Sequence, residues 1–478
     1  MIPLAKAIPL TGLAPDDEPT KAGILTDCLN VVPTTNGMKV ANGWLKTTPA
    51  LAASITGMLR AQATDGTPVF VLASAARLGV YLDYTNPTSH IDTVVPAAVQ
   101  PWAMGVFGNA AVVSGYFSRI QQASAASGWV FAEIADAPKA KLIVSAANFV
   151  LAFGTNDATY GEQGDRWWCS AINDHTSWTP SLSTQATTGR IVQDGGGFTS
   201  ALPLGQNVVA YKDRAMFVGA YVGSPVVWQW DRVPGYAGAA GPGCVCDIGG
   251  AHFIVGPDGF WLFDGTRPQP IGVDAIAQSF FGGMMYLGSA RDCLCYYNKR
   301  TTSVHVWFSR STGAGRDSCL VYNVATGTWG YRRHVRQVTA VGEYGPIPSG
   351  GVTTMCVAAN DGSAVGYQWI DDESKAPAPL PSFTTGVLGD DSTNTRVLDL
   401  RLICASSAAT GATVQGYTGR TSGAVTTAAG TGAEMDGKLP IRQHDRWHKF
   451  TVNLPYAYGS ATPEIRAITI NGVTGGTR

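Results

Sequence analysis

The feature that most constrains this chain is a long series of short apolar runs separated by turn-forming residues. Ala110 to Ser114 follows the pair Gly108-Asn109, and Phe260 to Phe263 follows a Gly-Pro-Asp-Gly turn. Gly and Asn tolerate positive φ, and apolar runs on both sides of such a pair are typical of a β-hairpin. No stretch of about 15 residues has the 3.6-residue period of an amphipathic helix. The sequence therefore predicts an all-β protein.

The hairpin pattern continues along most of the chain. Its further runs are Val69 to Ala73, Leu78 to Leu82, Trp102 to Phe107, Lys141 to Ser145, Phe149 to Phe153, Val208 to Tyr211, Ala215 to Val218, Val226 to Trp230, His252 to Val255, Cys293 to Tyr297, Ser303 to Phe308, Leu320 to Tyr322, Trp329 to Arg332 and Met355 to Ala358. One β-sandwich is too small for so many hairpins, whereas a propeller accommodates them by adding blades around an axis. The tight turn before Trp329 suits an outer blade hairpin, with an ordinary sandwich hairpin as the alternative. We therefore predict a β-propeller-like ring of antiparallel hairpins over residues 51–375.

A change in composition ends this series. Residues 371–375 form the densest charge patch, and the Pro-rich stretch 376–382 is typical of a stiff linker. Residues 383–478 contain runs that alternate apolar and polar side chains, such as Val397 to Ile403. That alternation predicts a C-terminal β-sandwich-like domain. Residues 1–50 are interpreted as an N-terminal arm or platform segment.

Three small-residue segments have little apolar surface of their own. They are Gly235 to Gly243, Thr421 to Gly432 and the end of the chain, Gly472 to Arg478. Such segments bury too little apolar area to offset the entropy of ordering them. We expect partners to order the first two, and the last to be flexible or ordered by a partner.

Composition and charge exclude several classes of protein. Only 14% of the 478 residues are charged, against about 25% in a typical soluble protein, which leaves broad uncharged contact surfaces. The formal net charge of −1 gives no global field to attract nucleic acid or an anionic membrane. No apolar stretch approaches about 18 residues, so no membrane span is expected. The start of the sequence does not resemble a signal peptide.

Cysteine and histidine spacing does not predict a metal site. The pairs Cys244/Cys246 and Cys293/Cys295 could each share one face of a strand, but metal sites usually use Cys-x2-Cys spacing. We interpret these thiols as reduced, small hydrophobic residues. His444 and His448 would lie about 13 Å apart along one strand, too far for a shared ion.

Motifs of catalysis are also missing. Residues 195–197 are Gly-Gly-Gly without the Lys and helix of a phosphate loop, so a hinge or close backbone approach is expected. No Gly-x-Ser-x-Gly elbow supports a nucleophilic serine. Asn173 to Trp178 matches only part of the Asp-containing turn of sialidase-like propellers. We therefore expect no enzyme activity, no catalytic, cofactor-binding or metal-binding residue, and no cofactor.

One set of segments is more specific than these features. It comprises Arg166 to Pro180, Gly189 to Ile191, Val208 to Phe217, Trp228 to Trp230 and Gly256 to Gly272, with Asp27 to Pro33 and Gly37 before them and Asp445 to Phe450 after them. This order resembles the tail hub or nozzle proteins of short-tailed bacteriophages, the phage stabilisation protein family. Those chains pair an Arg-Trp strand, a hairpin with a Lys-Asp turn and an Asp-Gly hairpin. Cys169, Cys244 and Cys246 are not part of that pattern.

The resemblance implies a structural subunit of a podovirus short tail. Such a hub or nozzle extends the channel of the portal and adaptor, helps retain packaged DNA and passes it during ejection. The implied partners are copies of itself in a ring, a homohexamer, with the head-to-tail adaptor and portal, tail fibres or spikes, and genomic DNA transiently in the channel. The implied location is the virion tail, after synthesis in the bacterial host cytoplasm. The alternative is a propeller-type virion protein that binds or hydrolyses glycans.

Overall fold

The computed structural model describes residues 2–47, 54–82, 90–95, 101–312, 315–345, 354–360, 366–372, 375–405, 411–456 and 463–477. Strands account for 57% and helices for 5%, which confirms the predicted all-β class. The described helical segments are short turns: η1 (Ala125–Ser127), η2 (Val273–Ala277), η3 (Phe280–Met284), η4 (Ala290–Asp292) and η5 (Ser422–Ala424). The predicted boundary at residues 50 and 51 lies outside the described residues.

Five antiparallel sheets of four strands each follow one another along the chain, and within each sheet every strand pairs with the next. The first two contain β7 (Ile55–Gln62), β8 (Pro68–Ser74), β9 (Arg77–Tyr81) and β10 (His90–Val94), then β11 (Ala103–Phe107), β12 (Ala110–Ser114), β13 (Gln121–Ala123) and β14 (Ala132–Glu133). The third contains β15 (Lys139–Ala146), β16 (Phe149–Asp157), β17 (Gly161–Cys169) and β18 (Thr187–Arg190). The last two contain β19 (Ser200–Leu204), β20 (Asn207–Lys212), β21 (Ala215–Gly223) and β22 (Val227–Arg232), then β23 (Val245–Asp247), β24 (His252–Val255), β25 (Phe260–Phe263) and β26 (Gln269–Ile271).

A long bent strand continues this series. β27 (Leu294–Asn298), β28 (Ser303–Phe308) and β29 (Arg316–Asn323) lead into the 17-residue strand β30 (Thr328–Tyr344). β30 pairs with β29 mainly through its first half and with β31 (Thr354–Asn360) through its second half. β32 (Gly366–Asp372) pairs with β31, and β6 (Gly43–Lys46) pairs with β32. A strand from near the start of the sequence therefore completes the last group of strands.

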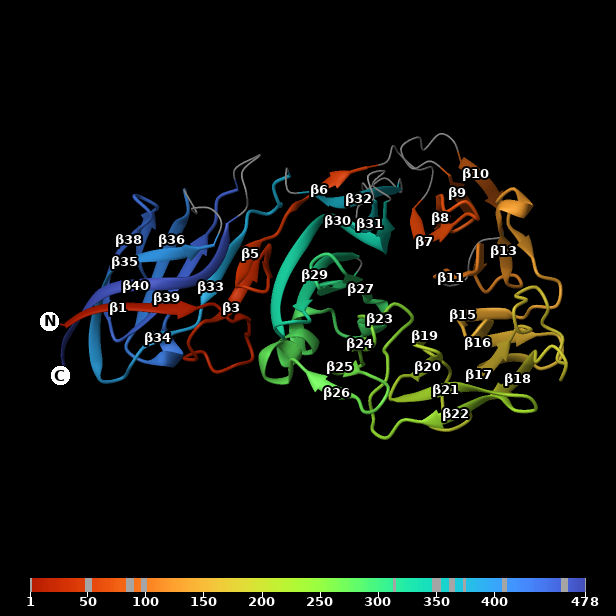
Figure 1. The fold of residues 1–478 in the computed structure, drawn as a ribbon. Coiled ribbons are helices and arrows are strands. Elements are labelled where there is room, and N and C mark those ends of the chain that lie inside the picture. Colours follow the sequence, from red (N-terminus) through yellow and green to blue (C-terminus); the bar gives the residue numbers. More distant parts are fainter. Residues whose placement is uncertain are drawn as a thin grey trace.

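The sheets contact one another through their first strands. β7 contacts β11, β11 contacts β15, β15 contacts β19, β19 contacts β23, and β23 contacts β27. β27 contacts β30 and β31, and both of these contact β7. The contacts thus return to the sheet where they began, and in Figure 1 the sheets follow one another around a common centre.

The two ends of the chain build a second pair of sheets together. The first continues the sheet that contains β27 to β32: from β30 it runs through β4 (Val31–Pro33), β5 (Met38–Val40), β40 (Glu464–Thr477), β35 (Thr393–Cys404) and β38 (Leu439–Asp445), with β1 (Ile2–Pro9) on β40. The other contains β2 (Gly12–Leu13), β3 (Ile24–Leu29), β33 (Ser382–Thr385), β39 (Trp447–Asn453), β36 (Thr413–Gly419) and β37 (Thr427–Ala433), with β34 (Leu388–Gly389) on β39. Figure 1 shows both termini on this side of the molecule, because β1 and β40 pair along their lengths. The division of the chain at 376–382 stays a prediction.

One hydrophobic cluster joins this pair of sheets to the strands after β22. It includes Leu25 from β3, Phe253 from β24, Trp329 from β30 and Phe450 from β39, all buried. Trp329 fills the space between two sheets, with its ring centroid 4.6 Å from that of Tyr322 and 6.3 Å from that of Phe253. Since burial of apolar surface is the main stabilising contribution to folding, this shared cluster stabilises the two parts together.

A tryptophan also fills the space between two earlier sheets. Trp178 is fully buried among Val112 and Ile120 of one sheet and Ala152 and Trp168 of the next. Its indole N–H donates to a backbone carbonyl at 2.8 Å, which satisfies the polar atom that burial isolates.

The three small-residue segments pack or pair within the described chain, and a contribution of partners to their order stays a prediction. Within Gly235 to Gly243, residues 237–241 are buried in the chain, and a Cβ at Gly238 would lie 2.2 Å from the carbonyl oxygen of Lys212, whereas Tyr236 is exposed. Thr421 to Gly432 contributes η5 and most of β37, which pairs with β36. Gly472 to Thr477 is part of β40 and pairs with β1 and β35, while Arg478 lies outside the described residues. Backbone pairing between distant segments orders these stretches without large side chains.

Candidate functional site

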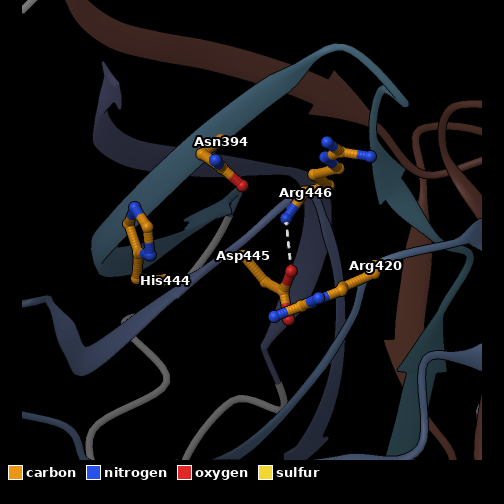
Figure 2. Close-up of a pocket in the computed structure, with 5 residues that line it drawn as sticks. All are labelled: Asn394, Arg420, His444, Asp445 and Arg446. Carbon is orange, nitrogen blue, oxygen red and sulfur yellow. Dashed lines mark hydrogen bonds between the residues drawn. The ribbon is translucent and has the colours of Figure 1, made fainter. Parts of the chain in front are cut away.

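A pocket of about 360 Å³ opens in the C-terminal pair of sheets (Figure 2). It lies where the chain crosses from one sheet to the other, because Arg446 is the residue between β38 and β39 and these strands belong to different sheets. Its lining residues are Asn394 from β35, Arg420 after β36, His444 and Asp445 from β38, and Arg446. The lining is therefore almost wholly polar.

The side chains of the pocket present different chemistry on its two sides. Figure 2 shows Arg420 extending toward Asp445, while Asn394 and His444 lie on the other side. The Arg446 backbone N–H donates to Oδ1 of Asp445 at 2.9 Å. Arg420 and His444 are exposed, whereas the other three residues are half-buried.

A buried chain of hydrogen bonds supports the floor of this pocket. The Gln443 amide donates to Nδ1 of His448 at 2.9 Å, so Nε2 of His448 carries the proton and donates to Oγ1 of Thr395 at 2.6 Å. The Thr395 hydroxyl then donates to the backbone carbonyl of Asp445 at 3.3 Å. Burial lowers the pKa of His448 to about 4, so the imidazole is neutral at pH 7. The direction of each bond is consistent with this neutral tautomer.

Gly416 leaves room for the side chain of Gln443. A Cβ at Gly416 would lie 2.0 Å from Oε1 of Gln443 and 2.5 Å from Cδ1 of Ile441, so a larger residue would displace these side chains. The Trp447 indole N–H donates to Oδ1 of Asp391 at 2.7 Å on the adjoining side. The residues around the sheet crossing are thus fixed by contacts from several strands.

The two histidines considered for a metal lie on different strands of different sheets. His444 lies on β38 at the pocket, and His448 is buried on β39. The chain does not continue as one strand between them, because Arg446 is the crossing point. Among the described residues, no group of three His, Cys, Asp or Glu side chains could hold a metal ion.

The paired cysteines are reduced and lie in or against the core. None of the nine cysteines forms a disulfide in the described structure. The Cys244 thiol donates to the carbonyl oxygen of Ala290 at 3.1 Å, and burial raises its pKa to about 12. Cys293 is also buried, with its sulfur 3.8 Å from that of Met285. Burial holds these thiols in the protonated form, in which they pack as small hydrophobic residues.

Gly197, the last residue of the glycine triplet 195–197, lies at a close backbone approach, one of the two expected roles, whereas Gly195 and Gly196 have φ values of +54° and +69° and open space around them. A Cβ at Gly197 would lie 3.2 Å from Cα of Gly164. The buried Lys212 ammonium group donates to the carbonyl oxygens of Ile191 and Gln193, each at 2.8 Å, just before the triplet. These contacts fix the connection between the third and fourth sheets.

A second buried polar group lies at β6 and was missed from the sequence. The Arg332 guanidinium forms two hydrogen bonds with the Asp371 carboxylate, at 3.0 and 3.1 Å. It also donates to the Asn42 carbonyl oxygen at 3.0 Å and lies 4.2 Å from the ring centroid of Trp44. Arg332 thereby connects β30, β32 and the start of β6. The available signals were a charged residue inside a buried strand run and Asp371 at the edge of the charge patch.

The pocket was also missed from the sequence. The sequence predicts a single strand through Asp445 to Phe450. The structure instead crosses from one sheet to the other within this segment, and no local pattern of apolar residues marks that crossing. The signal that could have found the crossing is the adjacent charged pair Asp445-Arg446 between two alternating runs.

No family model matches this sequence, and no curated protein matches it. Among the described residues, no helix has the length and apolar character needed to cross a membrane.

Proposed function

We propose that this chain is a structural subunit of the short tail of a bacteriophage, a hub or nozzle built on a β-propeller and a C-terminal β-sandwich-like domain. The propeller has seven blades. Five are the four-stranded sheets from β7 to β26, the sixth is β27 to β30, and the seventh combines the second half of β30 with β31, β32 and β6.

The observation that most supports this proposal is the circular order of contacts between the first strands of successive sheets. These contacts pass from β7 through β11, β15, β19, β23 and β27 to β30 and back to β7. In a propeller the first strand of each blade faces the axis, which gives this order. β6, which pairs with β32, joins the beginning of the chain to its last blade and closes the ring without a covalent bond.

The segments behind the resemblance occupy positions that build the fold. Trp167 and Trp168 are buried in β17, and Trp178 is buried between sheets. The Lys212-Asp213 turn joins β20 to β21, and the Asp258-Gly259 turn joins β24 to β25. A shared order of such residues supports a shared architecture, which is the basis for placing this chain with tail hub proteins.

The pairing of strands and the shared core of this chain suit the mechanical needs of a phage tail. A tail channel needs units that keep their shape and expose few free strand edges for unwanted pairing. Here the terminal strands β1 and β40 pair with each other, and one core cluster joins the C-terminal sheets to the later blades. Six copies form a ring below the adaptor, and the near-neutral chain allows DNA to move through without strong electrostatic retention.

The test uses tail-less, DNA-filled heads of the phage whose genome encodes this chain. Purified full chain is mixed with these heads, and co-sedimentation and protection of DNA from nuclease are measured. We expect binding at the portal vertex and slower loss of DNA, while heads with complete tails bind none because the position is already filled. If tail-less and complete particles bind the chain equally, or neither binds it, the proposal is wrong.

A further inference from the structure

We propose that the pocket between β38 and β39 binds a sugar that carries a carboxylate group. The inference is independent of the proposed tail function. The pocket has a volume of about 360 Å³, which lies within the usual range for small-ligand sites, roughly 300–1,000 Å³, and its lining is almost wholly polar. A polar, hydroxylated ligand suits such a lining better than an apolar one.

Arg420 is the group that selects the carboxylate. Its side chain is exposed and extends into the pocket. No ion pair of Arg420 occurs among the described residues, although Asp445 lies across from it. A guanidinium presents a planar fork of donors that matches a carboxylate with two parallel hydrogen bonds.

The remaining side chains suit hydroxyl groups. Asp445 offers carboxylate oxygens as acceptors, and Asn394 offers both a donor and an acceptor. His444 adds a ring nitrogen on the same side as Asn394. Neighbouring sugar hydroxyls both donate and accept, so this mixture complements them.

The pocket is held ready for such a ligand. The Asp445 backbone is fixed by Thr395, and Thr395 is fixed by the buried, neutral His448. The Asp445 side chain is fixed by the Arg446 N–H. Less ordering entropy is therefore lost on binding, which favours affinity.

The same residues disfavour nucleic acid as the ligand. Binding of single strands usually combines a continuous basic groove with aromatic side chains on which bases stack. None of the five lining residues is Phe, Tyr or Trp, and the Asp445 carboxylate would repel a neighbouring phosphate. A single sugar acid needs only one cation and leaves Asp445 free to accept from hydroxyls.

Isothermal titration calorimetry of the full chain tests the proposal. The probes are a short uronic-acid oligosaccharide, a neutral oligosaccharide of equal length, inorganic phosphate and a short DNA strand. We expect the uronic-acid probe to bind at least about tenfold more tightly than the other three, since only this probe combines a carboxylate with hydroxyl groups and hydrogen bonds between charged groups are stronger than neutral ones. Equal binding of the neutral probe, tighter binding of phosphate or DNA, or no binding of the uronic acid would overturn the proposal.

Two variants and a control place the binding in this pocket. Arg420→Gln removes an exposed charge that forms no ion pair within the described part of the chain, and it should weaken binding of the uronic-acid probe at least about tenfold. Asp445→Asn should weaken binding of the uronic-acid probe severalfold by removing a charged acceptor. A site for simple anions would instead bind its anion more tightly once that negative charge is lost. Arg442→Gln is the control, because Arg442 is exposed on β38 but does not line the pocket. Equal effects of Arg420→Gln and Arg442→Gln would show that the pocket is not the site.

Discussion

Removing the Arg332 guanidinium should destabilise the protein strongly. The Arg332 side chain is 2% exposed and that of Asp371 is 17% exposed, so Arg332→Met leaves a carboxylate with little access to water. The substitution also removes the hydrogen bond to the Asn42 carbonyl and the contact with Trp44. Breaking a buried ion pair by removing one partner costs about 3–5 kcal/mol. Because Asp371 retains some exposure, we expect the lower part of this range.

Urea-induced unfolding, followed by tryptophan fluorescence, measures this change in the free energy of unfolding. The matched control is Arg214→Met, because Arg214 pairs with Asp258 at 2.9 Å but their side chains are 58% and 60% exposed. Exposed pairs contribute about 0–1 kcal/mol, so this control should change stability little. The double variant Arg332→Met/Asp371→Leu should lose less than the two single changes added together, since no charge remains buried. If Arg332→Met unfolds at the same urea concentration as Arg214→Met, the inference that Arg332 stabilises the junction with β6 is wrong.

Three further predictions address the core, pH dependence and activity. Trp178→Ala should lower the free energy of unfolding by about 3–5 kcal/mol. Trp261→Ala should lower it by less, because Trp261 is only half-buried. Equal unfolding curves for Trp178→Ala and the wild type would exclude the assigned packing. Burial lowers the pKa of His305 to about 3 and of His448 to about 4, below the unfolded value near 6.5, so the unfolded chain gains protons first as pH falls. The contribution of these neutral histidines to the free energy of unfolding should therefore be complete above about pH 6.5. Below that pH, the free energy of unfolding should fall by up to about 1.4 kcal/mol per pH unit for each histidine until about pH 4. Urea unfolding at pH 7 and pH 5 checks this, and a His448→Gln variant should depend less on pH; equal stability at both pH values for the wild type would contradict it. Incubation with host surface polysaccharide should release no reducing sugar, and release that stops on mutation of one carboxylate would favour the enzyme alternative.

The strands that the sequence predicts best are those buried on both faces. Ala110–Ser114 and His252–Val255 agree residue for residue with β12 and β24, because every side chain in them is buried and the apolar run is continuous. The outer strands β14 and β18 were missed, since their residues are exposed or half-buried and form no apolar run. An edge strand is set by pairing with its neighbour, and the local sequence does not encode that partner.

The same reason explains what was missed at the ends of the chain. β6 pairs with β32, more than half the sequence away, and β1 pairs with β40. Gly472 to Thr477 has no apolar pattern and lies in a strand because two partners supply its hydrogen bonds. The pocket residues come from β35, β38 and the turn after β36, so only the assembled sheets bring them together.

The most direct test of the proposed tail function is an electron cryo-microscopy reconstruction of the bacteriophage tail that we propose contains this chain. We expect a ring of six copies directly below the adaptor, each with seven sheets around a common axis and its C-terminal sheets beside them. A tail that lacks the chain, or that carries it as an isolated copy away from the channel, would contradict this expectation.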